Sequence, residues 1–262
     1  MNRALMTAAT GMDAQQKTIQ AIANNLANIN TTGFKASRAN FVDLLYQTIQ
    51  APGTQTSNST ESPSGLQLGL GTRTVSVQRM DSQGDIKASG NSLDMAIEGK
   101  GYFRVTMPGG DVGYTRAGNF NLDSQGRLVT ADGNPLDPEI TIPAEATSIT
   151  IGSDGTVSVT QAGSTTSEQV GQVTLTTFPN PAGLLAIGRN LLQETSASGS
   201  ATDGTPGQQG VGAISQGMLE LSNVDIVAEL VNMIAAQRAY ELGSKVITST
   251  DQMLRNATSV IR

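Results

Sequence analysis

Hydrophobic and polar positions divide this chain into two helical ends and a middle part patterned for strands. Near the N-terminus, apolar residues recur with the seven-residue spacing of a helix that packs on another helix, with one polar break at Gln15. The members of this stripe are Leu5, Ala8, Met12, Ile19, Ile22, Leu26 and Ile29. They predict a helix over residues 3–29. The segment 28–33 that follows from its end is polar and contains Gly33, which are signals that stop a helix.

A second stripe near the C-terminus has a mean spacing of about 3.6 residues, the period of a straight helix. Its members include Val224, Val231, Ala235, Ala239, Leu242, Val246 and Met253. At about 1.5 Å per residue each terminal helix would span roughly 40–55 Å, which is long for one small domain to cover. Two interpretations stay open, an intramolecular helical hairpin and contact with other subunits, and the pattern favours self-association.

The middle of the chain alternates with period two and is punctuated by Gly, Asp and Asn turns, which predicts an all-β body. Its candidate strands include Arg73–Arg79, Tyr102–Thr106, Ile140–Ile142 and Ala213–Leu219. Residues 35–50 fit either one helical face or extended chain. Residues 51–71 are rich in Gly and Pro and predict a long polar loop or an extended arm. Four apolar residues of this region are candidates for packing contacts: Tyr46, Leu66, Leu68 and Leu70.

These patterns together predict an α+β protein with two long terminal helices packed together, a central all-β body and a Gly/Pro-rich arm. The expected domains are a helical domain from residues 1–34 and 222–262, a connecting arm over 35–71, and a β domain over 72–221. A fragment of about 72–220 is expected to be soluble, folded and monomeric, whereas the terminal segments are expected to serve assembly.

Composition argues against most kinds of chemistry. The 262 residues carry a formal net charge of −6 and contain no Cys, His or Trp. Disulfides, thiolate metal sites and His-based acid–base catalysis are therefore excluded, and the scattered Lys and Arg form no basic patch for nucleic acid.

No apolar run reaches the ~18 residues of a membrane span, and the N-terminus has no secretory signal pattern. Asp94 and Glu98 could form a carboxylate pair, but exposed turn charges explain them better. We expect no enzyme activity, no cofactor, no metal and no small-molecule substrate.

Four motifs, in order along nearly the whole chain, resemble signatures of one family. Residues 23–35 (ANNLANINTTGFK) resemble the N-terminal signature of the bacterial flagellar rod and hook proteins. Residues 93–103 (LDMAIEGKGYF) and 114–120 (YTRAGNF) resemble its central motif. Residues 221–231 with 237–241 (QRAYE) are similar to its C-terminal signature. The segment 41–49 and the arm that follows it resemble the distal-rod branch, with proximal rod and hook subunits as alternatives and a β-rich binding module as a weaker one.

The resemblance implies a structural subunit that polymerises helically into a hollow drive shaft across the periplasm. The implied partners are other copies of the chain, the proximal rod proteins, the hook protein, the P-ring and L-ring, the rod cap and the flagellar type III export apparatus. Export would need no cleaved signal peptide, and the termini would be disordered before assembly. An acidic residue at Leu26 or Leu242 is then expected to abolish rod growth while the β body stays folded.

Overall fold

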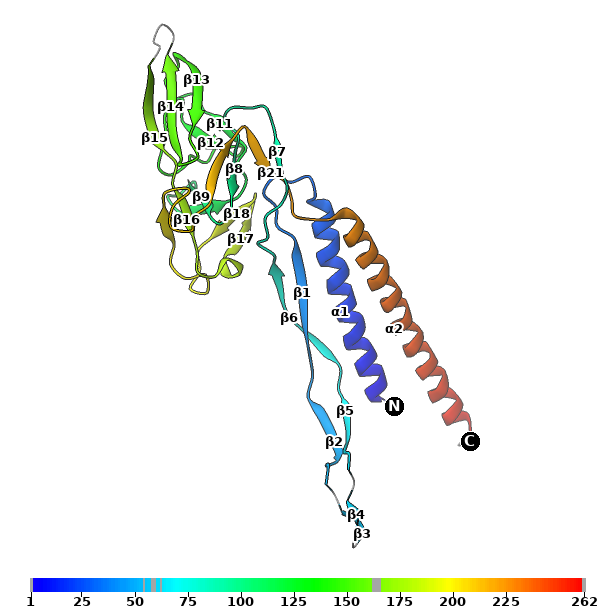
Figure 1. Cartoon of the computed structure of the whole chain (residues 1–262). Coiled ribbons are helices and arrows are strands. Elements are labelled where there is room, and N and C mark those ends of the chain that lie inside the picture. Colours follow the sequence, from blue (N-terminus) through cyan, green and yellow to red (C-terminus); the bar gives the residue numbers. More distant parts are fainter. Residues whose placement is uncertain (1, 54, 58–59, 62, 162–165, 261–262) are drawn as a thin grey trace. The chain divides into compact units, whose positions relative to one another are not determined.

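The computed structural model describes residues 2–53, 55–57, 60–61, 63–161 and 166–260 (Figure 1). The chain forms two compact units. The first, here called the helix unit, comprises Met1–Leu26, Ser37–Gln78 and Asp225–Arg262. The second, the β unit, comprises Ala27–Ala36 and Arg79–Val224. The predicted α+β class, with terminal helices and a central strand-rich body, is confirmed.

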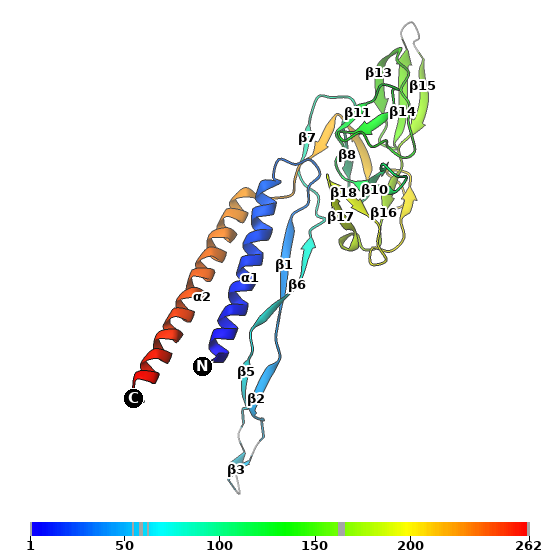
Figure 2. The ribbon, with the colours of Figure 1, turned by 180° about the vertical axis from the view of Figure 1, so that it is seen from behind.

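The helix unit contains two long helices. They are α1 (Asn2–Ala27) and α2 (Ile226–Val260), which lie side by side in both ribbon views (Figures 1 and 2). Asp225 caps α2, because its Oδ1 accepts the N–H groups of Val227 and Ala228 at 2.8 and 3.1 Å. A carboxylate at this position satisfies two free amides and also complements the helix dipole.

The segment between residues 37 and 79 is a two-stranded antiparallel ribbon rather than an irregular loop. β1 pairs with β6, β2 with β5, and β3 with β4. These strands are Ser37–Asp43 (β1), Tyr46–Gln50 (β2), Gln55–Ser57 (β3), Thr60–Glu61 (β4), Leu66–Gly69 (β5) and Thr72–Arg79 (β6). Of the two conformations that the sequence left open for residues 35–50, the extended one is therefore correct from Ser37 onward. The period-two alternation of Leu66, Leu68 and Leu70 reflects β5 and its continuation.

Small side chains and one buried amide join the pieces of the helix unit. The Asn25 side chain accepts the Ser37 N–H at 2.8 Å and donates to the Ser37 carbonyl and to Glu229 Oε1, both at 2.9 Å. A Cβ on Gly243 of α2 would lie 2.7 Å from the Met12 side chain of α1. Glycine therefore allows this close approach between the helices. The hydroxyl oxygen of Thr10 accepts the N–H of Thr72 at 3.4 Å, which places the ribbon against α1.

The β unit is built around a six-stranded sheet with the order β17-β18-β10-β9-β16-β19. A three-stranded sheet, β13-β14-β15, and the pairs β8–β20, β7–β21 and β11–β12 complete it. The bounds are Ile86–Ala88 (β7), Met95–Glu98 (β8), Tyr102–Thr106 (β9), Val112–Thr115 (β10), Phe120–Leu122 (β11), Leu128–Thr130 (β12), Ala146–Ile151 (β13), Thr156–Gln161 (β14), Ser167–Gln172 (β15), Leu175–Thr177 (β16), Leu185–Gly188 (β17), Leu191–Gln193 (β18), Thr202–Gly204 (β19), Ala213–Gln216 (β20) and Met218–Glu220 (β21). A short 3₁₀ helix spans Pro181–Gly183. The main hydrophobic core of this unit includes Phe103, Phe120 and Leu175, and a second, smaller cluster includes Tyr114 and Phe178.

Two predicted strands need correction. Ile140–Ile142 forms only an isolated bridge between Thr141 and Arg127, because Pro138 and Pro143 on either side lack the N–H that a longer ladder requires. The predicted strand Ala213–Leu219 is interrupted at Gly217, whose φ of +71° turns the chain between β20 and β21.

A methyl group on Gly118 should destabilise the β unit. An added Cβ would lie 1.6 Å from the carbonyl oxygen of Met95, and the Met95 N–H already donates to the Gly118 carbonyl at 2.9 Å. Gly118→Ala is therefore expected to lower the free energy of unfolding by about 1–3 kcal/mol, measured by urea denaturation. Gly69→Ala is the control, since its Cβ would meet Tyr46 at an ordinary 3.4 Å. Equal stability of the two variants would contradict the close approach.

Candidate assembly surface

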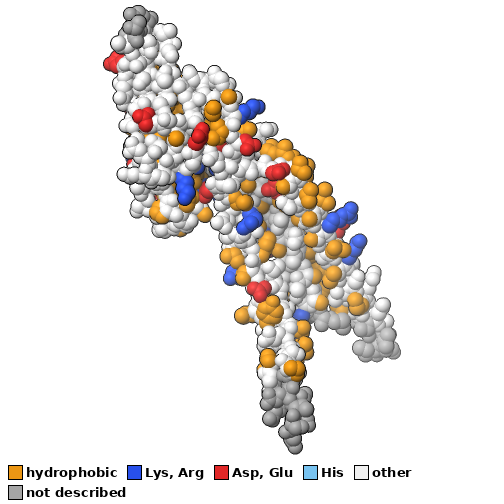
Figure 3. Space-filling view, in the orientation of Figure 1, with side chains coloured by type: hydrophobic (Ala, Val, Ile, Leu, Met, Phe, Trp, Pro, Cys, Tyr) orange, Lys and Arg blue, Asp and Glu red, His pale blue; other side chains and the backbone are white. Residues whose placement is uncertain are grey.

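Hydrophobic side chains are distributed in opposite ways in the two units. Of the 27 buried hydrophobic residues in the described part of the chain, only Ala14, Ile22 and Ala236 belong to the helix unit. Of the 24 large hydrophobic residues that are exposed, 20 belong to it. Figure 3 shows these side chains gathered over the helices and the ribbon. The β unit thus has a normal core, whereas the helix unit has almost none.

Helix α2 has two different faces. Its inner face carries small residues such as Ala236 and Gly243, and Gly243 lies against Met12 of α1. Its outer face exposes most of the predicted C-terminal stripe, with Leu242 61% exposed. The other exposed members of that stripe are Val231, Ala235, Val246 and Met253, while Ala239 is half-buried. The stripe identified from the sequence is therefore mainly the face of α2 that the chain itself leaves uncovered.

The members of the predicted N-terminal stripe that lie on α1 are all at least half-buried. Ile22 is buried, and Leu5, Met12, Ile19 and Leu26 are half-buried. Ile29 and Val224 do not lie on the helices at all, because α1 ends at Ala27 and α2 begins at Ile226. The predicted helix over residues 3–29 is thus two residues too long, since Thr31 N–H already donates to the Asn28 carbonyl in a turn. Ile29 and Val224 belong to the β unit and are not part of the helix surface.

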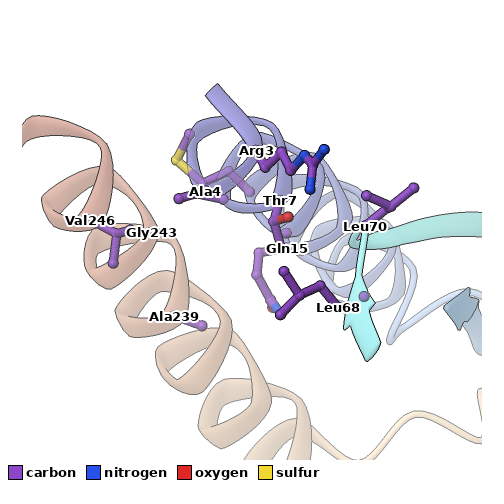
Figure 4. Close-up of a pocket in the computed structure, with 13 residues that line it drawn as sticks. Arg3, Ala4, Thr7, Gln15, Leu68, Leu70, Ala239, Gly243 and Val246 are labelled. Atoms are coloured by element: carbon purple, nitrogen blue, oxygen red, sulfur yellow. The ribbon is translucent and has the colours of Figure 1, made fainter. Parts of the chain in front are cut away.

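An apolar groove of about 540 Å³ opens between α1, α2 and the ribbon (Figure 4). Small residues of the two helices, among them Gly11, Ala239 and Gly243, form its walls, and Leu68 and Leu70 enter it from the ribbon. Its polar side chains, such as Arg3 and Gln15, are too few to bind a polar ligand in several directions. A concave, largely hydrophobic surface of this kind fits apolar side chains of another polypeptide.

The arm residues singled out from the sequence all lie on the ribbon or on its continuation. Tyr46, Leu66, Leu68 and Leu70 are each exposed, although Leu68 and Leu70 also line the groove. A two-stranded ribbon is only marginally stable in water, and both of its outer edges lack a strand partner among the described residues. The ribbon therefore presents both apolar side chains and edges that no other described strand covers.

A buried ionic cluster in the β unit is a second candidate site. Glu220 is completely buried, and its Oε1 accepts from Lys35 Nζ at 2.5 Å and from the Gly84 N–H at 3.0 Å. Its Oε2 accepts from Arg116 Nη1 at 3.2 Å. Arg116 also donates to the carbonyls of Ile97 and Gly99, at 3.3 and 2.6 Å. Three segments that are far apart in sequence thus converge on one carboxylate.

Burial also shapes the titration of the cluster. The cost of desolvation lowers the pKa of Lys35, which the hydrogen bond and the charge of Glu220 oppose. Burial likewise raises the pKa of Tyr102 to about 12. Tyr102 is therefore protonated at neutral pH and donates to Asp81 Oδ1 at 3.1 Å. Its ring also lies under the Arg116 guanidinium, 5.5 Å from ring centroid to Cζ.

Neighbouring hydrogen bonds extend the cluster toward the C-terminal signature. The Asn223 side chain accepts the Ala36 N–H at 2.7 Å and donates to the carbonyls of Met80 and Ser82, at 2.9 and 3.0 Å. The Gly33 N–H donates to the Glu220 carbonyl at 2.8 Å. We refer to Lys35, Arg116, Glu220 and Asn223 as the latch.

Sequence reasoning missed the latch as a site. Lys35, Arg116 and Asn223 lie in motifs that carried the family resemblance, but nothing distinguished Glu220 from the other acidic residues. The useful signal was the convergence of three motifs, which no local pattern reveals.

Other kinds of site find no support in the described residues. They contain no cluster of three or more His, Cys, Asp or Glu side chains that could hold a metal ion. Within the same part of the chain, neither helix is apolar enough over a sufficient length to cross a membrane.

Comparison with known proteins places these features in one class. Residues 5–35 match the family described as "Flagella basal body rod protein", and residues 96–159 match "Flagellar hook protein FlgE/F/G D1 domain". Residues 215–260 match "Flagellar basal body rod FlgEFG protein C-terminal". The three matches contain most of α1, all of α2 and all four residues of the latch, and they define the class as rod and hook proteins of the bacterial flagellum.

Full-length relatives narrow this class. The chain is 51% identical to "Flagellar basal-body rod protein FlgG" of Buchnera aphidicola (Acyrthosiphon pisum), with 96% of each chain covered. It is 50% identical to the protein of the same name in Caulobacter vibrioides, over 99% of both chains, and 42% identical to that of Bacillus subtilis, over 100% of both. The chain therefore belongs to the flagellar basal-body rod protein family, a family of structural proteins of the basal body.

Proposed function

We propose that this chain is a structural subunit of the distal rod of the flagellar basal body, polymerising helically into a hollow shaft that transmits torque and through which export substrates pass. The single observation that carries the proposal is the exposed apolar surface of the helix unit. A heterologous contact of this surface with a different face of the next copy produces a helical filament when the rotation does not close.

The magnitude of this surface supports self-assembly. Full burial of a large apolar side chain contributes about 1.5–3 kcal/mol, so a half-exposed one still offers roughly 1 kcal/mol. Twenty such side chains offer on the order of 20 kcal/mol. This exceeds the roughly 4–15 kcal/mol that association costs in lost freedom of motion. The proposed contact residues are the outer face of α2, the half-buried residues of α1, and the groove with Leu68 and Leu70.

Further partners follow from a place in the distal rod. At its two ends the shaft would meet the proximal rod proteins and the hook protein, with a rod cap at the growing tip. The P-ring and L-ring would surround it as a bushing in the periplasm. The type III export apparatus would deliver each subunit without a cleaved signal peptide.

The proposal is tested with basal bodies isolated from cells that lack this chain. Electron microscopy should show rods that stop before their distal part, and re-expression of the chain should restore full length. Rods of normal length in the deletion strain would refute a distal rod subunit.

Shortening the ribbon should change the stiffness of the rod without preventing assembly. Gln50 pairs with Leu66 across the ribbon, so deletion of residues 53–63 leaves four residues to close the hairpin. We expect rods to form with altered bending, measured as the persistence length of isolated rods in electron micrographs. Replacement of residues 53–63 by a Gly/Ser segment of equal length is the control for chain length. Complete loss of export would instead indicate a secretion signal in the deleted segment.

A further inference from the structure

The latch holds the parts of the β unit from which the chain continues into the helix unit. Lys35 and Ala36 precede β1, Met80 and Ser82 follow β6, and Glu220 and Asn223 precede α2. The Met80 N–H donates to the Ala36 carbonyl at 2.8 Å, and Lys35 Nζ donates to the Ser82 carbonyl at 2.7 Å. Each of these segments therefore bonds to both of the others.

The chemistry of the latch makes these segments depend on one another. Glu220 is fully buried, and one of its two carboxylate oxygens is occupied by Lys35 and Gly84. If residues 33–36 left the β unit, that oxygen would lose its cationic partner inside the protein. Loss of one partner from a buried ion pair is strongly destabilising, because the remaining charge cannot regain its hydration.

Backbone geometry adds to this dependence. A Cβ on Gly33 would lie 2.6 Å from the Arg116 carbonyl carbon, and a Cβ on Gly84 would lie 2.1 Å from the Leu221 carbonyl oxygen. The segments are thus in direct backbone contact at two points. Arg116, which directly follows β10, pairs with Glu220 at the same junction and so joins these segments to the six-stranded sheet.

We propose that the latch is closed in the free subunit and holds residues 33–36 and 220–223 on the β unit before α1 and α2 contact any other copy. The N-terminal segment, residues 33–36, and the C-terminal segment, residues 220–223, then become ordered cooperatively. Only the helices and the ribbon would remain to be ordered during polymerisation, which reduces the conformational entropy lost at that step. This last consequence rests on the proposed rod function, whereas the closed latch itself does not.

Amide hydrogen exchange of the free full-length protein tests the latch directly. The amides of Gly33, Ala36 and Leu221 donate to Glu220, Asn223 and Asp85, respectively. We expect their exchange to be slowed at least about 100-fold relative to an unstructured chain, while amides of the outer turns of α1 and α2 exchange quickly. Exchange of these three amides at the rate of an unstructured chain would overturn the proposal.

Two variants test whether the segments are coupled. Lys35→Met should accelerate exchange at Gly33, Ala36 and Leu221 together by about 100-fold, because the buried Glu220 loses one of its two cationic partners and keeps only Arg116. Lys100→Met, at an exposed lysine of the same unit, should leave all three unchanged.

The milder variant Asn223→Ala covers the case in which Lys35→Met fails to fold. It removes the acceptor of Ala36 but touches neither Gly33 nor the ion pairs. Coupling predicts that exchange at Gly33 accelerates about tenfold, whereas acceleration confined to Ala36 would refute a cooperative latch. Electron microscopy of basal bodies remains a separate test, so that failure of the latch and failure of the rod function give different results.

Discussion

Leu242→Asp should abolish polymerisation while leaving the free subunit as stable as the wild type. Leu242 lies on the outer face of α2 and is 61% exposed, so an aspartate there keeps its hydration in the monomer. In a polymer that covers this face, the charge would be buried without a partner. Each copy would then lose several kcal/mol of contact energy, and the loss repeats at every subunit. Thermal melting of the purified variant and electron microscopy of basal bodies measure the two effects.

Two comparisons sharpen this experiment. Gln237→Glu introduces the same charge at an exposed polar position of α2 and should interfere much less. Leu26→Asp is less discriminating, since Leu26 is half-buried and the acid would also disturb packing within one chain. A lowered melting temperature for Leu242→Asp would support the intramolecular interpretation of this stripe. Normal rods in the same variant would exclude Leu242 from the interface.

Glu220→Gln should be among the most destabilising single substitutions in the β unit. The amide cannot neutralise Lys35 and Arg116, whose side chains are only 4% and 7% exposed. Removal of one member of a buried ionic group costs about 3–5 kcal/mol, because the remaining charges are left without compensation. Urea denaturation of the full-length protein, followed by a probe of the β unit, measures this loss.

Glu139→Gln is the matched control for that substitution. Glu139 also pairs with an arginine, Arg127 at 2.9 Å, but its side chain is 53% exposed. An exposed pair contributes only about 0–1 kcal/mol. Similar losses for both variants would mean that the latch carries no special share of the stability.

Strands with strong local patterns could be predicted from the sequence, while the pairings between them could not. Tyr102–Thr106 alternates and is bounded by glycine and turn residues, and it forms β9 with those bounds. By contrast β7, β18 and β19 have only three residues each, too few for a period to stand out. The pairing of β8 with β20 joins residues more than a hundred positions apart, and no local pattern encodes such a partner.

The same reasoning explains why one face of α2 was identified and the other was not. The outer face carries Val, Leu and Met, which dominate any pattern of hydropathy. The inner face packs through Ala236, Gly243 and Thr250, whose hydropathy is weak although their small size permits close contact. The stripe therefore indicated the uncovered face, and the contact within the chain was invisible to it.

The latch could not be predicted from the sequence, for a different reason. Buried charge is normally rare, so an isolated acid such as Glu220 is expected at the surface. Its burial becomes reasonable only when Lys35 and Arg116 converge on it. The fragment 72–220, which we expect to fold from its strand pattern, would lack Lys35 and would end at Glu220 itself. Whether that fragment folds without the N-terminal segment stays a prediction.

The unequal distribution of apolar surface between the two units has a consequence for the response to temperature. Burial of apolar surface lowers the heat capacity, and most burial within one chain occurs in the β unit. In the proposed polymer, contacts between subunits cover the large exposed apolar area of the helix unit, so polymerisation should carry a strongly negative heat-capacity change. Its driving force near room temperature is then mainly the entropy of released water, which weakens on cooling. A shaft built in this way should lose cohesion in the cold while each β unit stays folded.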